Sequence, residues 1–490
     1  MAEKDTRSVF LLSLGCPKNR VDSETMLGEL LQRGVSLAPS PEAADLMVVN
    51  TCAFIGPAKE ESIEAILELV RQKESTGGRL IVAGCLAQRY GSELLDEIPE
   101  IDQIIGTGGV GEVARAASSL SMESSTEALP RLFTPPLGQG DGAFGTRVRS
   151  TRGGSAYLKI ADGCDNRCAF CVIPSIRGPQ RSRPIEYLIE EASALIDGGV
   201  RELNLIAQDL SAYGRDLEKK PHLADLLDQL SGLDGLRWIR MLYAYPRPMP
   251  PRFFDVWGSR ENILPYLDIP LQHASDRMLR LMRRGPDTAF VRRHLEDIRS
   301  RLADSHRDLF VRTTFLVGHP GETVDDFKLL RDFLEEMRFE RVGVFVYSDE
   351  EGTPAYEMDA KVPPEVAEER RAELMALQQN ISAAHQMTLV GSRMEVLVEG
   401  ASEKSDMVLQ GRHAGQAPEV DGVVYLEQGC AAPGDMVDVE IHRAHEYDLV
   451  GRILRVTSKA AEPVGTLFDS ELPLIRAGAT LRVDPSKVGR

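Results

Sequence analysis

Three cysteines within eight residues constrain the fold of this chain more than any other feature. Cys164, Cys168 and Cys171 have a C-x₃-C-x₂-C spacing and follow an apolar run, Ala156–Ala161, that predicts a strand. Three thiolates this close together can hold one soft metal centre. Because structural zinc and iron–sulfur clusters usually take four protein ligands, three cysteines would leave one iron of a 4Fe–4S cluster open to a small molecule. The alternatives are a zinc site completed by a distant residue, or three unrelated buried thiols.

The segment around these cysteines, Ala161–Arg183, resembles the cluster-binding loop of the radical S-adenosylmethionine superfamily. The resemblance implies that S-adenosylmethionine binds the open iron through its amino and carboxylate groups. It also implies that one electron cleaves this molecule into methionine and a 5′-deoxyadenosyl radical, which removes a hydrogen atom from an unactivated C–H bond. Amino-acid side chains cannot perform this chemistry, so a cofactor has to supply it.

Length, charge and cysteine content exclude several classes of protein. A chain of 490 residues predicts about three domains. The formal net charge of −18 argues against broad binding to nucleic-acid phosphates, which needs clustered Lys and Arg. Seven cysteines do not form a disulfide scaffold in so long a chain and are better explained as ligands in a reducing compartment. Without a signal-peptide pattern or an apolar run of about 18 residues, we expect a cytoplasmic protein with no membrane span.

Residues 1–115 predict an N-terminal domain with a doubly wound parallel sheet. The expected strands are Val9–Leu14, Leu46–Val49 and Leu80–Ala83, and the expected helices are Ser23–Gln32 and Ser62–Val70. A cysteine follows each strand, namely Cys16, Cys52 and Cys85. Because ligands bind beyond the carboxyl ends of the strands in such sheets, we expect the three thiols to meet at one edge and to hold a second cluster. The alternative is that they are ordinary buried cysteines.

Residues 155–385 predict an open, partial (βα)₆ barrel, because strand-like and helical patterns alternate along this range. The expected strands are Ala156–Ala161, Glu202–Gln208, Trp238–Tyr245, Tyr266–Gln272, Phe310–Val317 and Arg341–Tyr347. Helices are expected between them, among them Ile185–Ile196, Leu223–Leu230, Ala289–Leu302 and Val324–Met337. Six units are too few to close an eight-fold barrel, and the active site should lie at the carboxyl ends of the strands.

The remaining segments predict a linker, a small β-barrel and a tail. Residues 116–154 are rich in Ser, Glu, Pro and Gly, which is typical of a linker. Residues 386–455 predict a small OB-like β-barrel, with short strands at Met394–Glu399, Met407–Gln410, Gly422–Leu426 and Met436–His442. Residues 456–490 show weak periodicity, so we expect a poorly ordered tail.

The order of these domains resembles that of the methylthiotransferases, which join an N-terminal three-cysteine domain, a radical S-adenosylmethionine barrel and a C-terminal TRAM barrel. The resemblance covers about residues 7–455 and rests on the motifs Leu14–Asn19, Asn50–Cys52, Ala83–Cys85, Gly163–Cys171, Asp268–His273 and Tyr447–Leu449. It implies two 4Fe–4S clusters, the second of which carries the sulfur that is inserted into the substrate. One S-adenosylmethionine would methylate this sulfur, and another would supply the radical.

Two branches of this family differ in substrate. One modifies an adenosine in tRNA, and the other modifies the β-carbon of an aspartate in small-subunit ribosomal protein number twelve. Pro17-Lys18 stands where the tRNA branch typically has Gln-Met, and the runs 162–167 and 421–426 also resemble the ribosomal-protein branch. Residues 386–452 contain five Lys or Arg against twelve Asp or Glu, which suits a basic protein better than tRNA. The sequence therefore predicts the ribosomal-protein branch, with tRNA modification and a non-catalytic iron–sulfur carrier as the alternatives.

Two further partners follow from this prediction. We expect an electron donor such as flavodoxin or ferredoxin to reduce the clusters. We also expect an acidic face of the C-terminal barrel to attract the basic ribosomal protein, with contributions from Glu395, Glu399, Glu419, Asp421 and Asp438.

Two residues outside the cysteine motifs are candidate cofactor contacts. Gln208 ends the predicted second strand, where the superfamily places a polar loop that contacts the amino group of S-adenosylmethionine. Arg312 lies on the predicted fifth strand and could point into the barrel as a partner for a carboxylate. The alternatives are an ordinary polar strand end and a solvent-exposed arginine. Arg177, Arg181 and Arg183 could bind substrate or a cofactor carboxylate, or could form a solvated basic loop. No side chain is assigned as a catalytic acid or base.

Overall fold

The computed structural model describes residues 8–119, 129–138, 147–151, 153–303, 308–402 and 405–460. The chain forms two compact units. The first contains the residues up to Ser150 together with Val172–Pro179, and the second contains Thr151–Cys171 and the described chain from Gln180 onward. Most of the predicted tail, from residue 461, lies outside the described residues.

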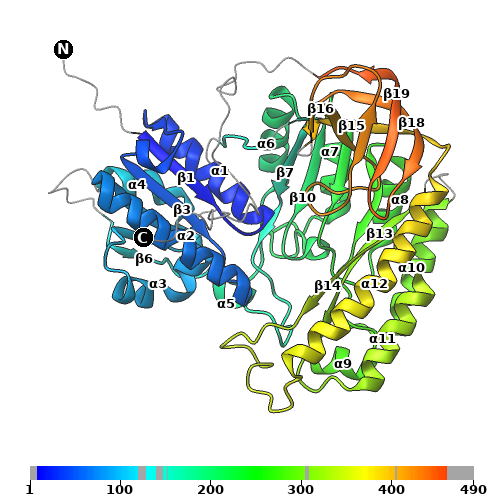
Figure 1. Ribbon diagram of the computed structural model, residues 1–490, viewed down its shortest axis with the longest axis horizontal. Helices are drawn as coiled ribbons and strands as arrows, with labels where there is room; N and C mark the ends of the chain where they lie inside the picture. The colour runs from blue at the N-terminus through cyan, green and yellow to red at the C-terminus, as the bar shows by residue number, and fades with distance from the viewer. Residues whose placement is uncertain are drawn as a thin grey trace, which may run out of the picture. The chain divides into compact units, whose positions relative to one another are not determined.

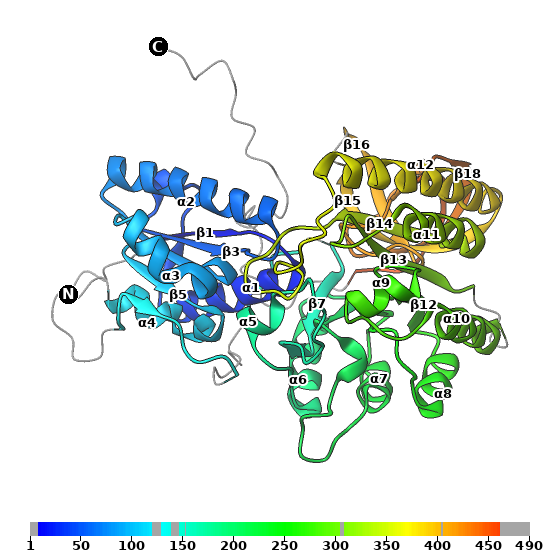
Figure 2. The same cartoon turned by 90° about the horizontal axis from the view of Figure 1, so that it is seen from below.

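The first unit is a six-stranded parallel sheet in the order β2-β1-β3-β4-β5-β6, with helices on both faces (Figures 1 and 2). Its strands are β1 (Ser8–Ser13), β2 (Ser36–Leu37), β3 (Leu46–Thr51), β4 (Arg79–Gly84), β5 (Gln103–Ile105) and β6 (Leu132–Phe133). Its helices are α1 (Pro17–Gln32), α2 (Gly56–Thr76), α3 (Cys85–Glu97), α4 (Val113–Ser119) and α5 (Ile173–Arg177), with short 3₁₀ turns at η1 (Pro41–Ala43) and η2 (Thr107–Glu112).

Alternation along the strands explains the two helical layers of this unit. Successive side chains of a strand point to opposite faces of the sheet. Val48 of β3 therefore packs with Leu27 of α1, whereas its neighbour Val49 packs with Ile66 of α2 on the other face. This arrangement confirms the predicted doubly wound sheet.

Two sequence predictions need correction in this unit. Helix α1 begins at Pro17 and not at Ser23, because proline fixes φ and lacks an N–H, which suits the first position of a helix. The range 116–154 is not all linker, since β6 pairs with β5 at the edge of the sheet. The Arg131 side chain holds this edge by donating hydrogen bonds to the Ile101 carbonyl.

The second unit begins with a six-stranded parallel sheet in the order β14-β13-β12-β11-β10-β7. The strands are β7 (Ser155–Lys159), β10 (Glu202–Ile206), β11 (Trp238–Met241), β12 (Ile263–Asp268), β13 (Phe310–Val317) and β14 (Arg341–Val346), and a hairpin of β8 (Ala161–Asp162) and β9 (Arg181–Ser182) lies beside the cysteine loop. The helices are α6 (Ile185–Asp197), η3 (Leu210–Ala212), α7 (Leu223–Ser231), α8 (Pro251–Ser259), α9 (Asp276–Leu281), α10 (Thr288–Ala303), α11 (Val324–Met337) and α12 (Pro364–Thr388). The structure confirms the predicted open (βα)₆ arrangement.

The two faces of this sheet differ in chemistry. One face packs against the helices in a single apolar core that includes Leu203, Ile239 and Val311. The residues next to them in the strands point to the other face. These residues are polar or charged, among them Lys159, Glu202, Asn204, Arg240, Tyr266 and Arg312. This face therefore carries polar groups, and several of them pair with residues of the C-terminal part of the chain, such as Glu202 with Arg412 and Arg312 with Asp421.

Strand β12 ends earlier than predicted. Its last residue is Asp268, whereas the sequence pattern suggested Gln272. Pro270 has no N–H to continue a ladder, and Gln272 has a left-handed backbone with φ of 75°. Gln272 makes only an isolated bridge to Phe315.

The C-terminal domain is a closed barrel in the strand order β15-β16-β17-β19-β18. Its strands are β15 (Arg393–Ser402), β16 (Ser405–His413), β17 (Val424–Glu427), β18 (Met436–Ala444) and β19 (Leu449–Ser458). The predicted barrel is confirmed, but the sequence pattern missed β19, because Gly451 and exposed arginines interrupt its alternation. The 25-residue helix α12 precedes the barrel and was also missed.

A buried ionic cluster joins the C-terminal barrel to the open barrel. Glu202 of β10 has a fully buried side chain and pairs with Arg240 at 2.9 Å and with Arg412 at 2.5 Å. Burial alone would raise the pKa of Glu202, but the two arginines outweigh it and lower the pKa to about 2. The Arg240 guanidinium also donates to the Ala414 carbonyl. The two domains of this unit therefore share a charged core.

We expect Arg412→Met to destabilise the second unit strongly. Removing one partner of a buried pair typically costs about 3–5 kcal/mol, because a buried charge is left uncompensated. Arg455→Met is the matched control on the same barrel, since Arg455 is 74% exposed and pairs with Asp438; such surface pairs contribute about 0–1 kcal/mol. Urea unfolding would measure the shift in midpoint. Equal shifts for the two variants would contradict this view of the cluster.

Among the helices that the structure describes, none combines the length and the apolar character of a membrane span.

Candidate functional site

The first unit brings Cys16, Cys52 and Cys85 to one edge of its sheet. Each follows one of three adjacent parallel strands, β1, β3 and β4. Cys16 is the N-cap of α1, Cys52 lies just before α2, and Cys85 is the first residue of α3. Parallel strands end on the same side, and the partial positive charge of the helix N-termini offsets part of the cost of anionic sulfur at this edge.

The three thiols are close enough to influence one another's ionisation. The pKa of Cys52 is raised to about 12, mainly by burial and then by the charges of Cys85 and Cys16. Burial also raises the pKa of Cys85 to about 11, although the Arg177 guanidinium acts in the opposite direction. Metal ions deprotonate the thiols that bind them, because the cation supplies the missing counter-charge. The strand order places the three thiols at one edge of the sheet, and the donor set fits a metal cluster; that they hold one stays a prediction.

Glycines allow the chain to turn at this edge. Gly15 has φ of 87°, and a Cβ atom there would lie 2.7 Å from the Cβ atom of Cys52. Gly84 has φ of 96°, and a Cβ atom there would lie 2.2 Å from Oδ1 of Asn50. Both positions therefore require glycine, which explains why Gly precedes Cys16 and Cys85 in the sequence.

The second unit carries the other three cysteines in the loop after β7 and β8. Cys164 and Cys171 are partly exposed, and Cys168 is buried. The Asn166 amide donates a hydrogen bond to Sγ of Cys164 at 3.4 Å, and the Arg284 guanidinium donates to Sγ of Cys168 at 3.5 Å. Donors to sulfur stabilise thiolates and tune the potential of a bound cluster. Burial still raises the pKa of the Cys164 thiol, and the hydrogen bond from Asn166 offsets only part of this, so the thiolate needs the counter-charge of a bound metal.

A second layer of polar contacts fixes Asn166. Its amide also donates to Asp209 at 2.8 Å, and the Arg247 guanidinium donates to its carbonyl at 3.1 Å. Arg247 pairs with Asp209 in turn. Tyr245 lies between two cations, 4.8 Å from Arg247 and 4.0 Å from Arg284 measured from each guanidinium carbon to the ring centroid.

Neither set of cysteines is arranged around a single ion. In the parts of the chain that the structure describes, no three His, Cys, Asp or Glu side chains are grouped for one metal ion. The cysteines of a 4Fe–4S cluster bind different irons, so their sulfurs do not converge on one point.

Gln208 lies beside the cysteine loop, as its position after β10 predicted. Its amide donates to Asp162 at 3.0 Å, and Asp162 also pairs with Lys159 at 3.3 Å. Its carbonyl oxygen is buried and has no hydrogen-bond partner within the described residues. A buried acceptor of this kind needs a donor, which the amino group of S-adenosylmethionine can provide. The residue therefore fits the predicted cofactor.

Arg312 is neutralised by carboxylates of this chain. Its guanidinium lies 3.4 Å from Asp268 and 3.6 Å from Asp421, and the Asp421 side chain is only 2% exposed. Asp421 also accepts a hydrogen bond from Tyr266 at 2.7 Å. These contacts give Arg312 a role in joining the C-terminal barrel to the sheet, and the predicted contact with cofactor or substrate stays a prediction.

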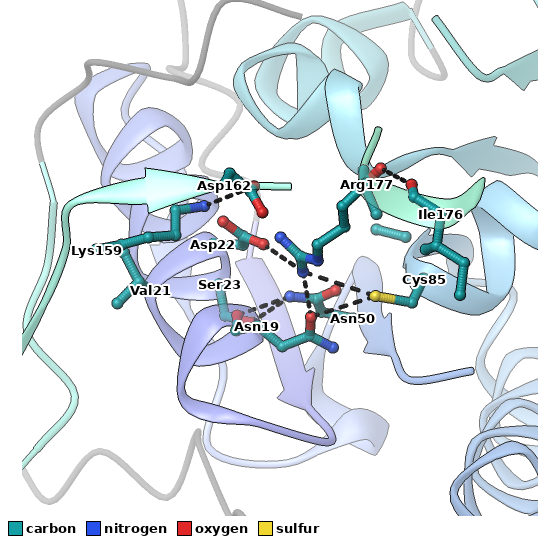
Figure 3. Close-up of polar contacts among 12 residues, drawn as sticks. Asn19, Val21, Asp22, Ser23, Asn50, Cys85, Lys159, Asp162, Ile176 and Arg177 are labelled. Atoms are coloured by element: carbon teal, nitrogen blue, oxygen red, sulfur yellow. Dashed lines mark hydrogen bonds and ion pairs between the residues drawn. The ribbon is translucent and has the colours of Figure 1, made fainter. Parts of the chain in front are cut away.

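The three arginines after the cluster loop go to different places. Arg177 lies in the first unit, buried against Cys85 (Figure 3). Arg183 lies in the second unit and pairs with Glu191 at 3.0 Å. Arg181 is part of the short strand β9. They therefore do not form one solvated basic loop.

Sequence reasoning missed the residues that contact the cysteines from a distance in the chain. Arg247 and Arg284 follow the third and fourth strands of the open barrel, and no spacing relates them to the cysteine motif. Asp209 follows Gln208 at the carboxyl end of β10, and this position was the one feature of the sequence that could have indicated its place near the cysteine loop. Only the fold brings these groups together.

Comparison with known proteins agrees with the order of the domains. Residues 8–106 match the model of "Uncharacterized protein family UPF0004", residues 158–334 match that of the radical SAM superfamily, and residues 390–454 match that of the TRAM domain. Among solved structures, a radical S-adenosylmethionine methyltransferase, TsrM, from Kitasatospora setae superposes with a TM-score of 0.53 at 15% identity, over 71% of this chain and 77% of that one. This likeness shows a shared fold. The chain is thus a radical SAM protein with an N-terminal three-cysteine domain and a TRAM barrel.

Curated relatives resolve the family within this class. The chain is 52% identical over 458 residues to the ribosomal protein uS12 methylthiotransferase RimO of Anaeromyxobacter sp. (strain K), covering 93% of this chain and 95% of that protein. It is 45% identical to the protein of the same name from Aquifex aeolicus, over 94% and 99% of the two chains. The chain belongs to the uS12 methylthiotransferase RimO family.

Proposed function

We propose that this protein methylthiolates the β-carbon of an aspartate in ribosomal protein uS12, the small-subunit protein number twelve. The observation that carries this proposal is the 52% identity to a RimO protein over nearly the whole of both chains. The two three-cysteine centres support it independently, because the reaction needs a radical source and a sulfur source. No observation favours tRNA as the substrate.

The proposal assigns the six cysteines to two 4Fe–4S clusters. Cys164, Cys168 and Cys171 would hold the first, and Cys16, Cys52 and Cys85 would hold the second. When bound, these clusters and S-adenosylmethionine supply the electron, the radical, the sulfur and the methyl group of the reaction. With three protein ligands each, both clusters keep one iron open.

The chain's own residues prepare the first centre for this chemistry. Asn166 and Arg284 donate hydrogen bonds to the sulfurs of Cys164 and Cys168, and so stabilise them as thiolates. The carbonyl of Gln208 would accept a hydrogen bond from the amino group of S-adenosylmethionine and so orient it. Arg247 holds Asn166 in place through a hydrogen bond, and the ring of Tyr245 packs against the guanidinium of Arg284.

We expect Gln208→Leu to weaken the binding of S-adenosylmethionine about tenfold. Removing one partner of a buried hydrogen bond costs about 1–3 kcal/mol because the other partner is left unsatisfied, and a factor of ten corresponds to about 1.4 kcal/mol. Gln229→Leu is the control, since Gln229 is exposed on α7. Equilibrium dialysis of the cluster-loaded protein would give both affinities. An unchanged affinity in Gln208→Leu would show that Gln208 does not contact S-adenosylmethionine.

The charge count of the C-terminal barrel does not by itself define a docking face. Four of the five carboxylates expected there pair with arginines of this chain: Glu395 with Arg237, Glu399 with Arg412, Asp421 with Arg312 and Asp438 with Arg455. The choice of uS12 therefore rests on the relatives and not on this count. We place the reaction in the cytoplasm, where ribosomes work, with flavodoxin or ferredoxin as the reductant.

Mass spectrometry of uS12 tests the proposed function. Cluster-loaded protein, S-adenosylmethionine, a reductant and purified uS12 should give a product in which one methylthio group replaces one hydrogen of an aspartate. Parallel reactions would contain tRNA in place of uS12, or uS12 variants with each aspartate changed to asparagine. Modified tRNA together with unmodified uS12 would move the protein to the other branch. Cleavage of S-adenosylmethionine with neither product would exclude both substrates.

A further inference from the structure

A buried arginine contacts a sulfur of the second centre. Arg177 is the last residue of α5 and is 3% exposed. Its Nη2 atom donates to Oδ1 of Asn19 at 2.6 Å, to Oδ2 of Asp22 at 3.0 Å and to Sγ of Cys85 at 3.6 Å (Figure 3). One guanidinium thus links a carboxylate, an amide and a thiol.

The surrounding structure holds Arg177 in this position. Ile176 is fully buried in the core of the first unit, and its carbonyl accepts a hydrogen bond from Thr107 at 2.8 Å. Asn19 is also fully buried, and its amide donates to the carbonyls of Leu14 at 3.0 Å and Thr51 at 2.9 Å. These carbonyls lie at the ends of the strand segments that lead to Cys16 and Cys52. Asn19 therefore fixes the guanidinium relative to all three cysteines.

The charge of Arg177 acts on the redox state of anything bound at Cys85. A cluster gains one negative charge when it is reduced, and both a nearby cation and an N–H donor to sulfur favour the reduced form. Asp22 opposes this effect, because its carboxylate neutralises part of the same guanidinium. The two residues should therefore shift a reduction potential in opposite directions.

We propose that Arg177 is a positioning residue of the second centre. Its guanidinium holds a positive charge against the sulfur of Cys85 and thereby raises the reduction potential of the cluster at Cys16, Cys52 and Cys85. The inference rests on the proposed function in one respect, namely that Cys16, Cys52 and Cys85 hold a cluster. The delivery of sulfur from this centre to the substrate would then depend on the reduction potential of its cluster.

A redox titration of the second cluster alone tests the inference. The triple variant Cys164→Ala, Cys168→Ala, Cys171→Ala removes the first cluster, and Arg177→Gln, Arg177→Lys or Asp22→Asn is then added. In Arg177→Gln the midpoint potential should fall by about 59 mV or more, which is a tenfold change in the ratio of reduced to oxidised cluster. Asp22→Asn should raise the potential, and Arg177→Lys should lie closer to the parent. Electron paramagnetic resonance would follow the reduced cluster.

Arg147→Gln is the matched control. The Arg147 side chain is 6% exposed and pairs with Glu24, which lies on α1 as Asp22 does. Arg147→Gln therefore removes a buried cation from the same unit without touching Cys85. The midpoint potential of the second cluster in Arg147→Gln should equal that of the parent. Equal potentials in Arg177→Gln and the parent, or shifts of the same sign in Arg177→Gln and Asp22→Asn, would overturn the inference.

Iron content separates the remaining outcomes. If Arg177→Gln binds no iron while Arg177→Lys binds iron at the parent potential, the positive charge is required and the inference stands. If both variants lose iron equally, Arg177 serves packing and the inference fails. If the parent triple variant itself binds no iron, the assignment of the second cluster fails as well, which distinguishes that failure from one confined to Arg177.

Discussion

Alanine at any one of Cys164, Cys168 or Cys171 is expected to abolish cleavage of S-adenosylmethionine. Three protein ligands are already one fewer than a 4Fe–4S cluster usually has, so two cannot hold it in the state that leaves one iron for the cofactor. Loss of the cluster removes the only source of the cleaving electron. Each variant should form no detectable 5′-deoxyadenosine with a strong reductant and should contain about half the iron of the unaltered protein.

Cys430→Ala is the control for this experiment. Cys430 is an exposed, free cysteine of the C-terminal barrel, outside both groups of three. Its replacement tests the effect of losing a thiol without losing a ligand, and both iron content and cleavage should stay unchanged. Cleavage at the normal rate in Cys168→Ala would show that the cluster is bound elsewhere.

Local sequence patterns predicted the features that depend on neighbours in the chain. The three-cysteine loop is contained within eight residues, and Cys16, Cys52 and Cys85 each follow an apolar strand directly. Parallel strands end at one edge, so topology alone brings three distant cysteines to the same edge of the sheet. Phe310–Val317 and Val324–Met337 were predicted with the bounds that the structure shows, because their periodicity is regular and their ends carry clear signals.

The groups that tune the site depend on contacts that no local pattern encodes. Arg284 is 116 residues from Cys168, and Arg412 is 210 residues from Glu202. The same limit applies to the charge count of the C-terminal barrel: it favoured the branch to which the chain belongs, but a formal charge does not show which carboxylates are already paired. Asp421 and Glu399 were expected to face a basic substrate, but both pair with arginines of this chain.

Arg177 illustrates how proximity in the sequence can mislead about position in the structure. It lies six residues after Cys171, so the sequence offered it as a contact for substrate or a cofactor carboxylate, or as part of a solvated basic loop. The core of the first unit takes up Val172 and Ile176 instead, and the segment Val172–Pro179 belongs to that unit. The burial of Val172 and Ile176 in this core therefore places the Arg177 guanidinium beside Cys85.

Alanine at Cys52 or Cys85 should produce a different loss, in which product disappears and cleavage of S-adenosylmethionine persists. These cysteines belong to the first unit, whereas the donors to Cys164 and Cys168 all come from the second. The first cluster should therefore assemble and supply the radical without its sulfur partner. We expect measurable 5′-deoxyadenosine, about half of the iron, and no methylthiolated uS12 in the mass spectrum.

The comparison of the two sets of variants separates radical formation from sulfur delivery. Cys16→Ala should behave like Cys52→Ala, although Cys16 is exposed and the other two thiols are buried, because the two remaining cysteines cannot hold the cluster. Cys430→Ala again serves as the control and should give product at the normal yield. If Cys52→Ala makes methylthiolated uS12 at that yield, the three thiols at the sheet edge do not deliver the sulfur, even though their convergence in the fold remains.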